Sequence, residues 1–120
     1  MQAKTQAGEE IDRVLAALVQ AGIINEQRFT ENYIYWRRNK GYGPKRIAIE
    51  LQARGIPAEM IAEQLEITDN AWFAEARKLW QKRFKGIQPS DFKSRAKQIR
   101  FLLYRGFTEA HITAVILNNE

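Results

Sequence analysis

The sequence predicts an all-α protein in which tandem three-helix repeats stack side by side into an elongated, curved array. Three observations predict this fold. Apolar residues recur at helical spacing, and no segment alternates apolar and polar residues over the length of a strand. Glycines follow the periodic segments and prolines stand near the start of the next ones, as is typical of helix ends. A short pattern around Gly55 also recurs around Gly106, which indicates an internal repeat.

The first four expected helices span residues 9–21, 25–40, 44–54 and 57–66. In the first, the apolar residues of segment 11–19 follow the i, i+3, i+4, i+7 spacing of one helix face. In the second, Phe29 and Trp36 lie on a shared face. Pro44 and Pro57 begin the third and fourth helices, where a proline has a suitable φ and its missing N–H costs nothing.

The last three expected helices span residues 69–84, 90–105 and 108–118. Phe73 and Trp80 mark the apolar face of the fifth helix, and Ile112 that of the seventh. Ser90 is the expected N-cap of the sixth helix, because serine oxygens accept hydrogen bonds from free N–H groups there. The expected apolar stripe of the sixth helix contains Phe92, Ala96, Ile99 and Leu103.

The repeat divides the chain into units. Segments 51–56 and 102–107 share a leucine, an arginine, a glycine and a final apolar residue in the same order. In both, the final apolar residue stands five positions before an isoleucine, the spacing of a hydrophobic staple at a helix start. We therefore expect a partial first repeat at 1–24, holding only its last helix, and complete three-helix repeats at 25–66 and 67–120.

Composition excludes several kinds of chemistry. The chain has 120 residues and no cysteine, which excludes disulfides, thiolate metal sites and a cysteine nucleophile. Its one histidine, His111, has no acidic partner one turn away and is expected at the surface. The carboxylates are scattered, and segment 41–43 lacks the lysine and spacing of a phosphate-binding loop. We therefore expect that the protein has no catalytic residue, no cofactor and no metal, and that it is not an enzyme.

Hydropathy predicts a soluble, cytoplasmic protein, which we expect to be a monomer. No apolar run approaches the roughly 20 residues that a membrane-spanning helix needs. Acidic residues at positions 9, 10 and 12 stand where a signal peptide would need an apolar stretch.

Positive charge is concentrated in two blocks. Residues 36–54 carry six basic and one acidic side chain, and residues 77–106 carry ten and one. Any single lysine here is best explained as part of a solvated face, but the two blocks together favour an anionic partner surface. Tyr42 either packs locally or contacts the partner, and Phe101 is either exposed for a partner or covered by a neighbouring unit. The candidate partner-binding residues are Arg37, Arg38, Lys40, Tyr42, Lys45, Arg46, Lys93, Lys97, Arg100, Tyr104 and Arg105.

The segment 47–65 has the outline of a helix-turn-helix DNA reader, but its charge argues against that role. Its second helix carries Glu59, Glu63 and Glu66, with no lysine or arginine. Phosphates would repel such a helix in the major groove. Salt-sensitive binding of a nucleic-acid backbone by the basic helices stays open.

Several motifs resemble the signature of the RecX family of bacterial recombination regulators. They are Lys40-Gly41-Tyr42-Gly43-Pro44, Arg46-Ile47, Glu50-Leu51, Gly55-Ile56, the segment from Arg28-Phe29 to Tyr33, and Arg100-Phe101-Leu102-Leu103-Tyr104-Arg105-Gly106-Phe107. The resemblance extends from about residue 10 to the end. It implies tandem three-helix repeats, usually three, of which the first is represented here by its last helix.

The resemblance also implies a function. Members of the family bind the RecA recombinase filament on single-stranded DNA, lie in its helical groove and restrain ATP hydrolysis, strand exchange and filament growth. The two basic blocks suit such a groove, while Gly41 and Gly43 are expected to serve the turn between helices. The alternative is a general helical module that binds single-stranded nucleic acid.

Overall fold

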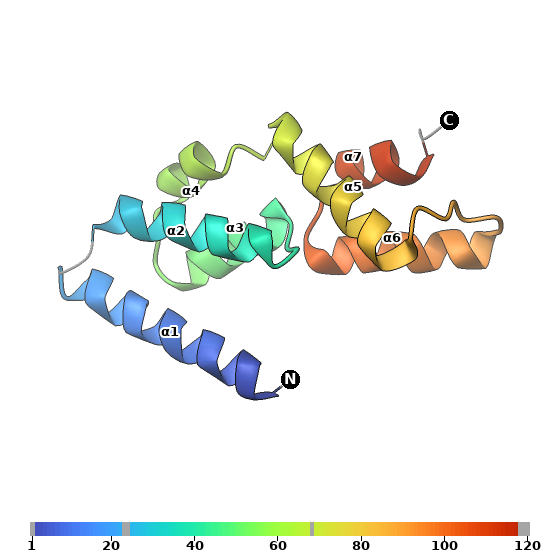
Figure 1. Cartoon of the computed structure of the whole chain (residues 1–120). Coiled ribbons are helices and arrows are strands. Elements are labelled where there is room, and N and C mark those ends of the chain that lie inside the picture. The colour runs from blue at the N-terminus through green and yellow to red at the C-terminus, as the bar shows by residue number, and fades with distance from the viewer. Residues whose placement is uncertain (1, 23–24, 68, 118–120) are drawn as a thin grey trace.

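The computed structural model describes residues 2–22, 25–67 and 69–117, which form helices and short connections without a strand (Figure 1). The predicted all-α class is confirmed. The elements are α1 Gln2–Gln20, α2 Glu26–Asn39, α3 Pro44–Ala53, α4 Ala58–Leu65, α5 Asn70–Phe84, α6 Phe92–Arg105, α7 Glu109–Ile112 and the π-helix η1 Thr113–Leu117. Helix α1 begins well before its expected start at residue 9, because segment 2–8 has good helix formers but no apolar stripe to reveal them.

The molecule is elongated, as predicted. Its principal extents are 52 × 33 × 17 Å, and its radius of gyration is 16.0 Å. A compact domain of this length would have a radius of gyration of about 14 Å. Helices α2, α3 and α4 pack together in one unit, and α5, α6, α7 and η1 pack in a second unit beside it (Figure 1). No helix in the described ranges is long and apolar enough to cross a membrane.

The core runs through both units. Ile47 and Leu51 of α3 and Leu102 of α6 are fully buried, as are Trp80 and Phe107. Segments 51–56 and 102–107 thus place corresponding apolar residues in the core. Burial of an aliphatic or aromatic side chain of this size stabilises the fold by about 1.5–3 kcal/mol.

The prediction of the apolar stripe of α6 is wrong for its first and last residues. Phe92 and Leu103 are exposed, and the buried residues of this helix are Gln98 and Leu102. Gln98 accepts a hydrogen bond from Trp80 Nε1 at 2.8 Å and donates one to the carbonyl of Ile87 at 3.0 Å. A polar side chain occupies this core position because both of its hydrogen-bonding groups are satisfied there.

The start of α6 also differs from the expectation, since its N-cap is Asp91 and not Ser90. The Asp91 carboxylate accepts a hydrogen bond from the backbone N–H of Ser94 at 2.7 Å. This hydrogen bond lowers the pKa of Asp91. A carboxylate at this position also interacts favourably with the positive end of the helix dipole.

The expected surface position of His111 is wrong. Its side chain is 1% exposed and packs edge-to-face against Phe73 and Phe107. His111 Nδ1 accepts a hydrogen bond from the backbone N–H of Thr108 at 3.1 Å, and the Thr108 hydroxyl accepts one from the N–H of His111. Burial lowers the pKa of His111, so the neutral ring, which can accept this bond, is favoured. The helix expected at 108–118 is α7 followed by the π-helix η1, and residue 118 lies outside the described residues.

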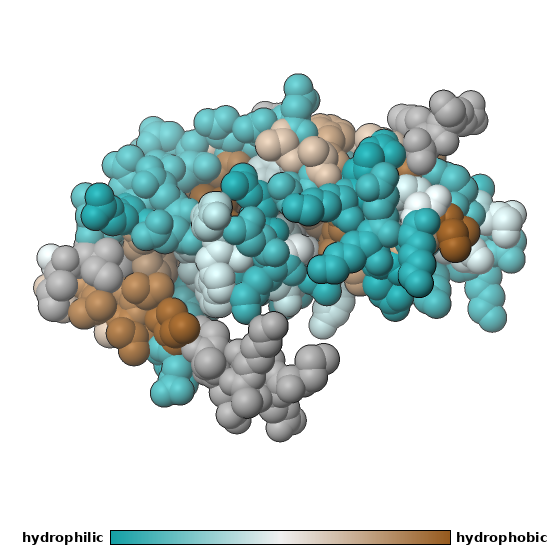
Figure 2. Space-filling model, viewed as in Figure 1, coloured by the Kyte–Doolittle hydropathy of each residue, from teal (hydrophilic) through white to brown (hydrophobic). Residues whose placement is uncertain are grey.

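Helix α1 packs through a residue that its apolar pattern does not indicate. Asp12 is buried and forms an ion pair with Arg54, which follows α3. Ile11 and Val14, both in the expected apolar stripe, are exposed instead. Figure 2 shows hydrophobic side chains gathered over α1, whereas hydrophilic side chains cover most of the face above α2 and α5. The apolar stripe of α1 is therefore only partly used by the fold.

Candidate partner-binding surface

The two units meet through their backbones at two glycines. The N–H of Gly43 donates to the carbonyl of Arg105 at 2.7 Å, and the N–H of Lys45 donates to the carbonyl of Gly106 at 2.9 Å. A Cβ atom on Gly43 would lie 2.5 Å from the Gly106 carbonyl group, so no larger residue fits this contact. The start of α3 is therefore held directly against the end of α6, which brings the two basic blocks together.

Tyr42 lies at this junction and packs against three guanidinium groups. The centre of its ring is 3.9 Å from Arg37 Cζ, 4.6 Å from Arg46 Cζ and 5.0 Å from Arg105 Cζ. Cations at these distances from an aromatic face are attracted by its quadrupole. Gly41, with a φ of +90°, makes the turn that places Tyr42 here.

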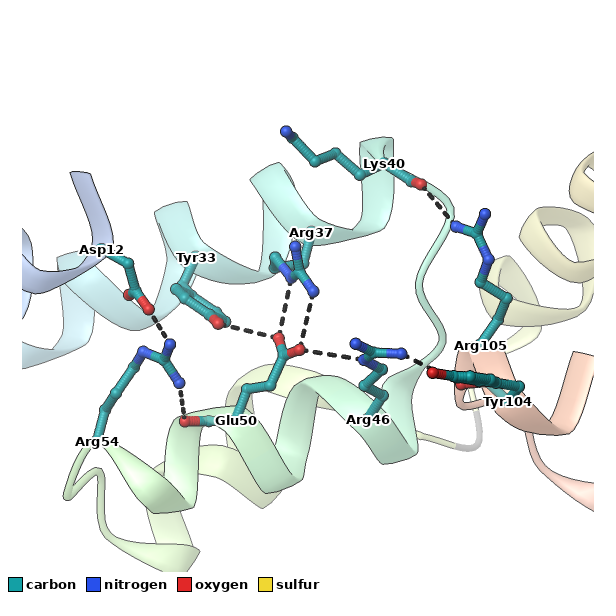
Figure 3. Close-up of polar contacts among 9 residues, drawn as sticks. All are labelled: Asp12, Tyr33, Arg37, Lys40, Arg46, Glu50, Arg54, Tyr104 and Arg105. Atoms are coloured by element: carbon teal, nitrogen blue, oxygen red, sulfur yellow. Dashed lines mark hydrogen bonds and ion pairs between the residues drawn. The ribbon is translucent and has the colours of Figure 1, made fainter. Parts of the chain in front are cut away.

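Glu50 holds two of these arginines in place (Figure 3). Its carboxylate accepts hydrogen bonds from Arg37 Nε at 2.9 Å and Nη2 at 2.8 Å, from Arg46 Nε at 3.2 Å, and from the Tyr33 hydroxyl at 2.9 Å. Burial alone would lower the pKa of Arg37, but the hydrogen bonds and charge of Glu50 outweigh it and raise that pKa. Burial, and then Glu50, raises the pKa of Tyr33 above its usual range. The four side chains therefore form one ionic, hydrogen-bonded cluster.

Arginines also connect each unit to the backbone of the other (Figure 3). Arg46 Nη1 donates to the carbonyl of Tyr104 at 3.4 Å, and Arg105 Nη1 donates to the carbonyl of Lys40 at 3.2 Å. Both hydrogen bonds are long, and both end on neutral acceptors. Among the described residues, the Arg105 guanidinium forms no ion pair, whereas that of Arg46 is also paired with Glu50.

A groove follows the junction and has a cavity volume of about 430 Å³. From the first unit it is lined by Tyr42 and Arg46. From the second unit it is lined by Arg83, Phe84, Lys97, Arg100, Phe101, Tyr104 and Arg105. None of these lining residues is acidic. A concave surface that combines cations and aromatic rings in this way suits an anionic ligand.

The structure brings together six of the predicted partner-binding residues in this groove: Tyr42, Arg46, Lys97, Arg100, Tyr104 and Arg105. Lys97 and Arg100 are exposed, and neither forms an ion pair within the described residues.

The other five predicted residues lie outside the groove. Arg37 is mostly buried, with 14% of its side chain exposed, and is paired with Glu50, so it supports the surface from within. Arg38 is half-buried, whereas Lys40, Lys45 and Lys93 are exposed.

Sequence reasoning missed Arg83 and Phe84 of α5. Arg83 Cζ lies 5.3 Å from the Phe84 ring centre and 5.5 Å from that of Phe101, and the two rings meet edge-to-face at 5.4 Å. Phe101 is therefore partly covered by its own unit. The high positive charge of segment 77–106 was the available signal for Arg83, but only the packing of α5 on α6 places Arg83 in the same groove as Arg100.

Cationic and aromatic side chains dominate the lining of the groove. Among the described residues, no group of three or more histidine, aspartate or glutamate side chains is placed to hold a metal ion. The groove offers positive charge, aromatic faces and hydrogen-bond donors. The fold and this surface together define a helical-repeat protein with a positively charged groove between adjacent repeats.

Comparison with known proteins identifies the family. Residues 25–65 match the model of the second three-helix domain of RecX, and residues 71–116 match that of the third. The regulatory protein RecX of Pseudomonas entomophila is 42% identical over 100 residues, which cover 83% of this chain and 64% of that protein. The RecX protein of Ectopseudomonas mendocina is 39% identical over 100 residues, which cover 83% of this chain and 67% of that protein.

A third relative, the regulatory protein RecX of Pseudomonas fluorescens strain SBW25, is 37% identical over 108 residues, which cover 90% of this chain and 70% of that protein. The chain belongs to the RecX family, as the sequence motifs predict. It spans about two thirds of the length of these curated relatives.

Proposed function

We propose that this chain is a cytoplasmic regulator that binds the RecA recombinase filament on single-stranded DNA. It restrains ATP hydrolysis, strand exchange and filament growth by contact and not by catalysis. The observation that carries the proposal is the groove in which Arg46 of one unit and Lys97 and Arg100 of the next meet without a carboxylate in the lining. Family membership supports the recombinase as the partner, because the relatives are regulatory proteins named RecX.

Shape and charge support binding to a filament. The body is 52 Å long, enough to extend over more than one contact site on a larger assembly. The groove presents cations that an anionic surface would attract over a distance of about one Debye length. Because backbone hydrogen bonds join the two units at the junction, the cations of both units lie on one continuous surface.

A titration of recombinase ATP hydrolysis tests the proposal. The measurement uses filaments on single-stranded DNA and increasing concentrations of this protein. We expect inhibition at concentrations too low to cover the DNA, because the effect passes through the recombinase. Inhibition that rises only with the fraction of DNA covered would contradict the proposal.

The aromatic rings of the groove favour a second candidate, a module that binds single-stranded nucleic acid. Tyr104 is exposed beside Arg46, and bases stack on such rings while the cations neutralise phosphates. This candidate predicts that affinity for a bare single-stranded oligonucleotide falls steeply with salt, with a log–log slope of about −0.7 per phosphate contacted. Absence of binding at low salt would reject it.

A further inference from the structure

A second depression adjoins the groove and has a different chemistry. Its cavity volume is about 340 Å³, at the lower end of the range of ligand pockets. It shares Arg46 and Tyr104 with the groove, while Ile49 of α3 and Leu103 of α6 also line it. The buried ring of Phe107 belongs to the same lining. We call this depression the notch.

Two apolar side chains of the notch, Ile49 and Leu103, lie outside the core. Ile49 is 66% exposed and Leu103 is 49% exposed, although both belong to helices that bury other residues in the core. Helix α3 packs through Ile47 and Leu51, which are fully buried, and Ile49 projects from a different face. Exposed apolar side chains from two units that line one concave site are typical of an interaction surface.

The charges around the notch indicate what the partner carries. Lys45 is exposed and lines the notch. Glu50 also lines it, but its carboxylate is paired with Arg37 and Arg46, so the three side chains together carry one positive charge. The site is therefore apolar inside and positively charged at its border. Its complement is an apolar side chain with carboxylates nearby, a combination that proteins have and a phosphate backbone lacks.

We propose that the notch receives a leucine or phenylalanine side chain from an acidic segment of the recombinase, and so makes the complex specific for protein. This inference rests on the proposed function. It divides the surface into two parts with separate tasks: the groove attracts the anionic filament through long-range charge, and the notch anchors one apolar side chain by burial. Anchors of this kind usually carry a large share of the affinity at an interface.

The test compares two pairs of serine substitutions with matched exposure. The notch variant combines Ile49→Ser with Leu103→Ser, which are 66% and 49% exposed. The control combines Ile87→Ser with Leu117→Ser, which are 66% and 48% exposed and line neither the notch nor the groove. Affinity is measured for recombinase filaments and for a bare single-stranded oligonucleotide, and circular dichroism checks that both variants fold.

We expect the notch variant to bind the filament at least about tenfold more weakly than the wild type, because two apolar contacts are lost. The control should bind within about twofold of the wild type, and affinity for the bare oligonucleotide should not change in either variant.

Four other outcomes are informative. Unchanged filament binding by the notch variant would overturn the inference and leave the proposed function standing. Equal losses for filament and oligonucleotide would overturn it in favour of a nucleic-acid site. A wild-type dimer in sedimentation that the notch variant abolishes would show that a second copy occupies the notch. Failure of the wild type to bind filaments at all would instead reject the proposed function.

Discussion

Replacing Gly106 by alanine is expected to lower the free energy of unfolding by about 2–4 kcal/mol. Gly106 has a φ of +99°, which costs an alanine about 1 kcal/mol. Its new Cβ would also overlap the side chain of Arg46 and lie 2.7 Å from the backbone nitrogen of Arg46. This position is the contact between the two units, so the overlap forces α3 away from α6. Urea unfolding, followed by circular dichroism, measures the loss.

Gly55→Ala is the matched control. Gly55 has a φ of +84°, so it carries a similar backbone penalty, but no atom lies within 4 Å of an added Cβ. Its substitution should cost only about 1 kcal/mol. The difference in unfolding free energy between the two variants therefore measures the cost of the steric overlap where the units approach closely. If both variants lose the same stability, the junction is not the tight backbone contact described above.

The second large effect is expected for Glu50→Gln. We expect the free energy of unfolding to fall by about 3 kcal/mol, because the substitution leaves the Arg37 guanidinium mostly buried without an opposite charge. The value is at the lower end of the range for buried pairs, since 14% of Arg37 and 17% of Glu50 stay exposed to solvent. Glutamine keeps the size of the side chain and one acceptor for the Tyr33 hydroxyl, so the loss reports on charge.

Glu63→Gln provides the comparison for this change. Glu63 lies exposed on α4, where removing the charge should alter stability by less than about 0.5 kcal/mol. The filament affinity of Glu50→Gln should also fall, because Arg37 and Arg46 lose the group that positions them below Tyr42. A stability loss for Glu50→Gln as small as that for Glu63→Gln would show that Arg37 does not need the opposite charge of Glu50 in its buried position.

The helices could be predicted because the signals that indicate a helix lie within short segments of the sequence. Apolar spacing, the glycines at helix ends and the repeated segments 51–56 and 102–107 depend only on near neighbours in the chain. Buried polar residues could not be predicted in this way. Asp12, Gln98 and His111 are buried beside polar partners, namely Arg54, Trp80 and Thr108 respectively. Among the described residues, one carboxylate oxygen of Asp12 has no hydrogen-bond partner. The first two pairs form only when the helices are packed, whereas the third forms locally at the start of α7.

The candidate surface was predictable in its general location and not in its detail. Charge counting identified the two basic blocks, and six of the predicted residues line the groove. It did not separate Arg37, which Glu50 neutralises, from Arg100, which forms no ion pair among the described residues. The notch could not be predicted from the sequence either. Ile49 and Leu103 come from different units, and only the backbone contact of Gly43 with Gly106 brings them into one site.

The central claim is that the groove between the two units contacts the recombinase filament, and charge reversal tests it most directly. Lys97→Glu with Arg100→Glu changes the groove, while Lys78→Glu with Lys82→Glu makes the same change in charge at exposed sites of α5 outside it. We predict that the groove pair weakens binding to recombinase filaments at least about tenfold and that the control pair weakens it by less than about threefold. Equal losses in the two pairs, or undiminished binding by the groove pair, would contradict the claim.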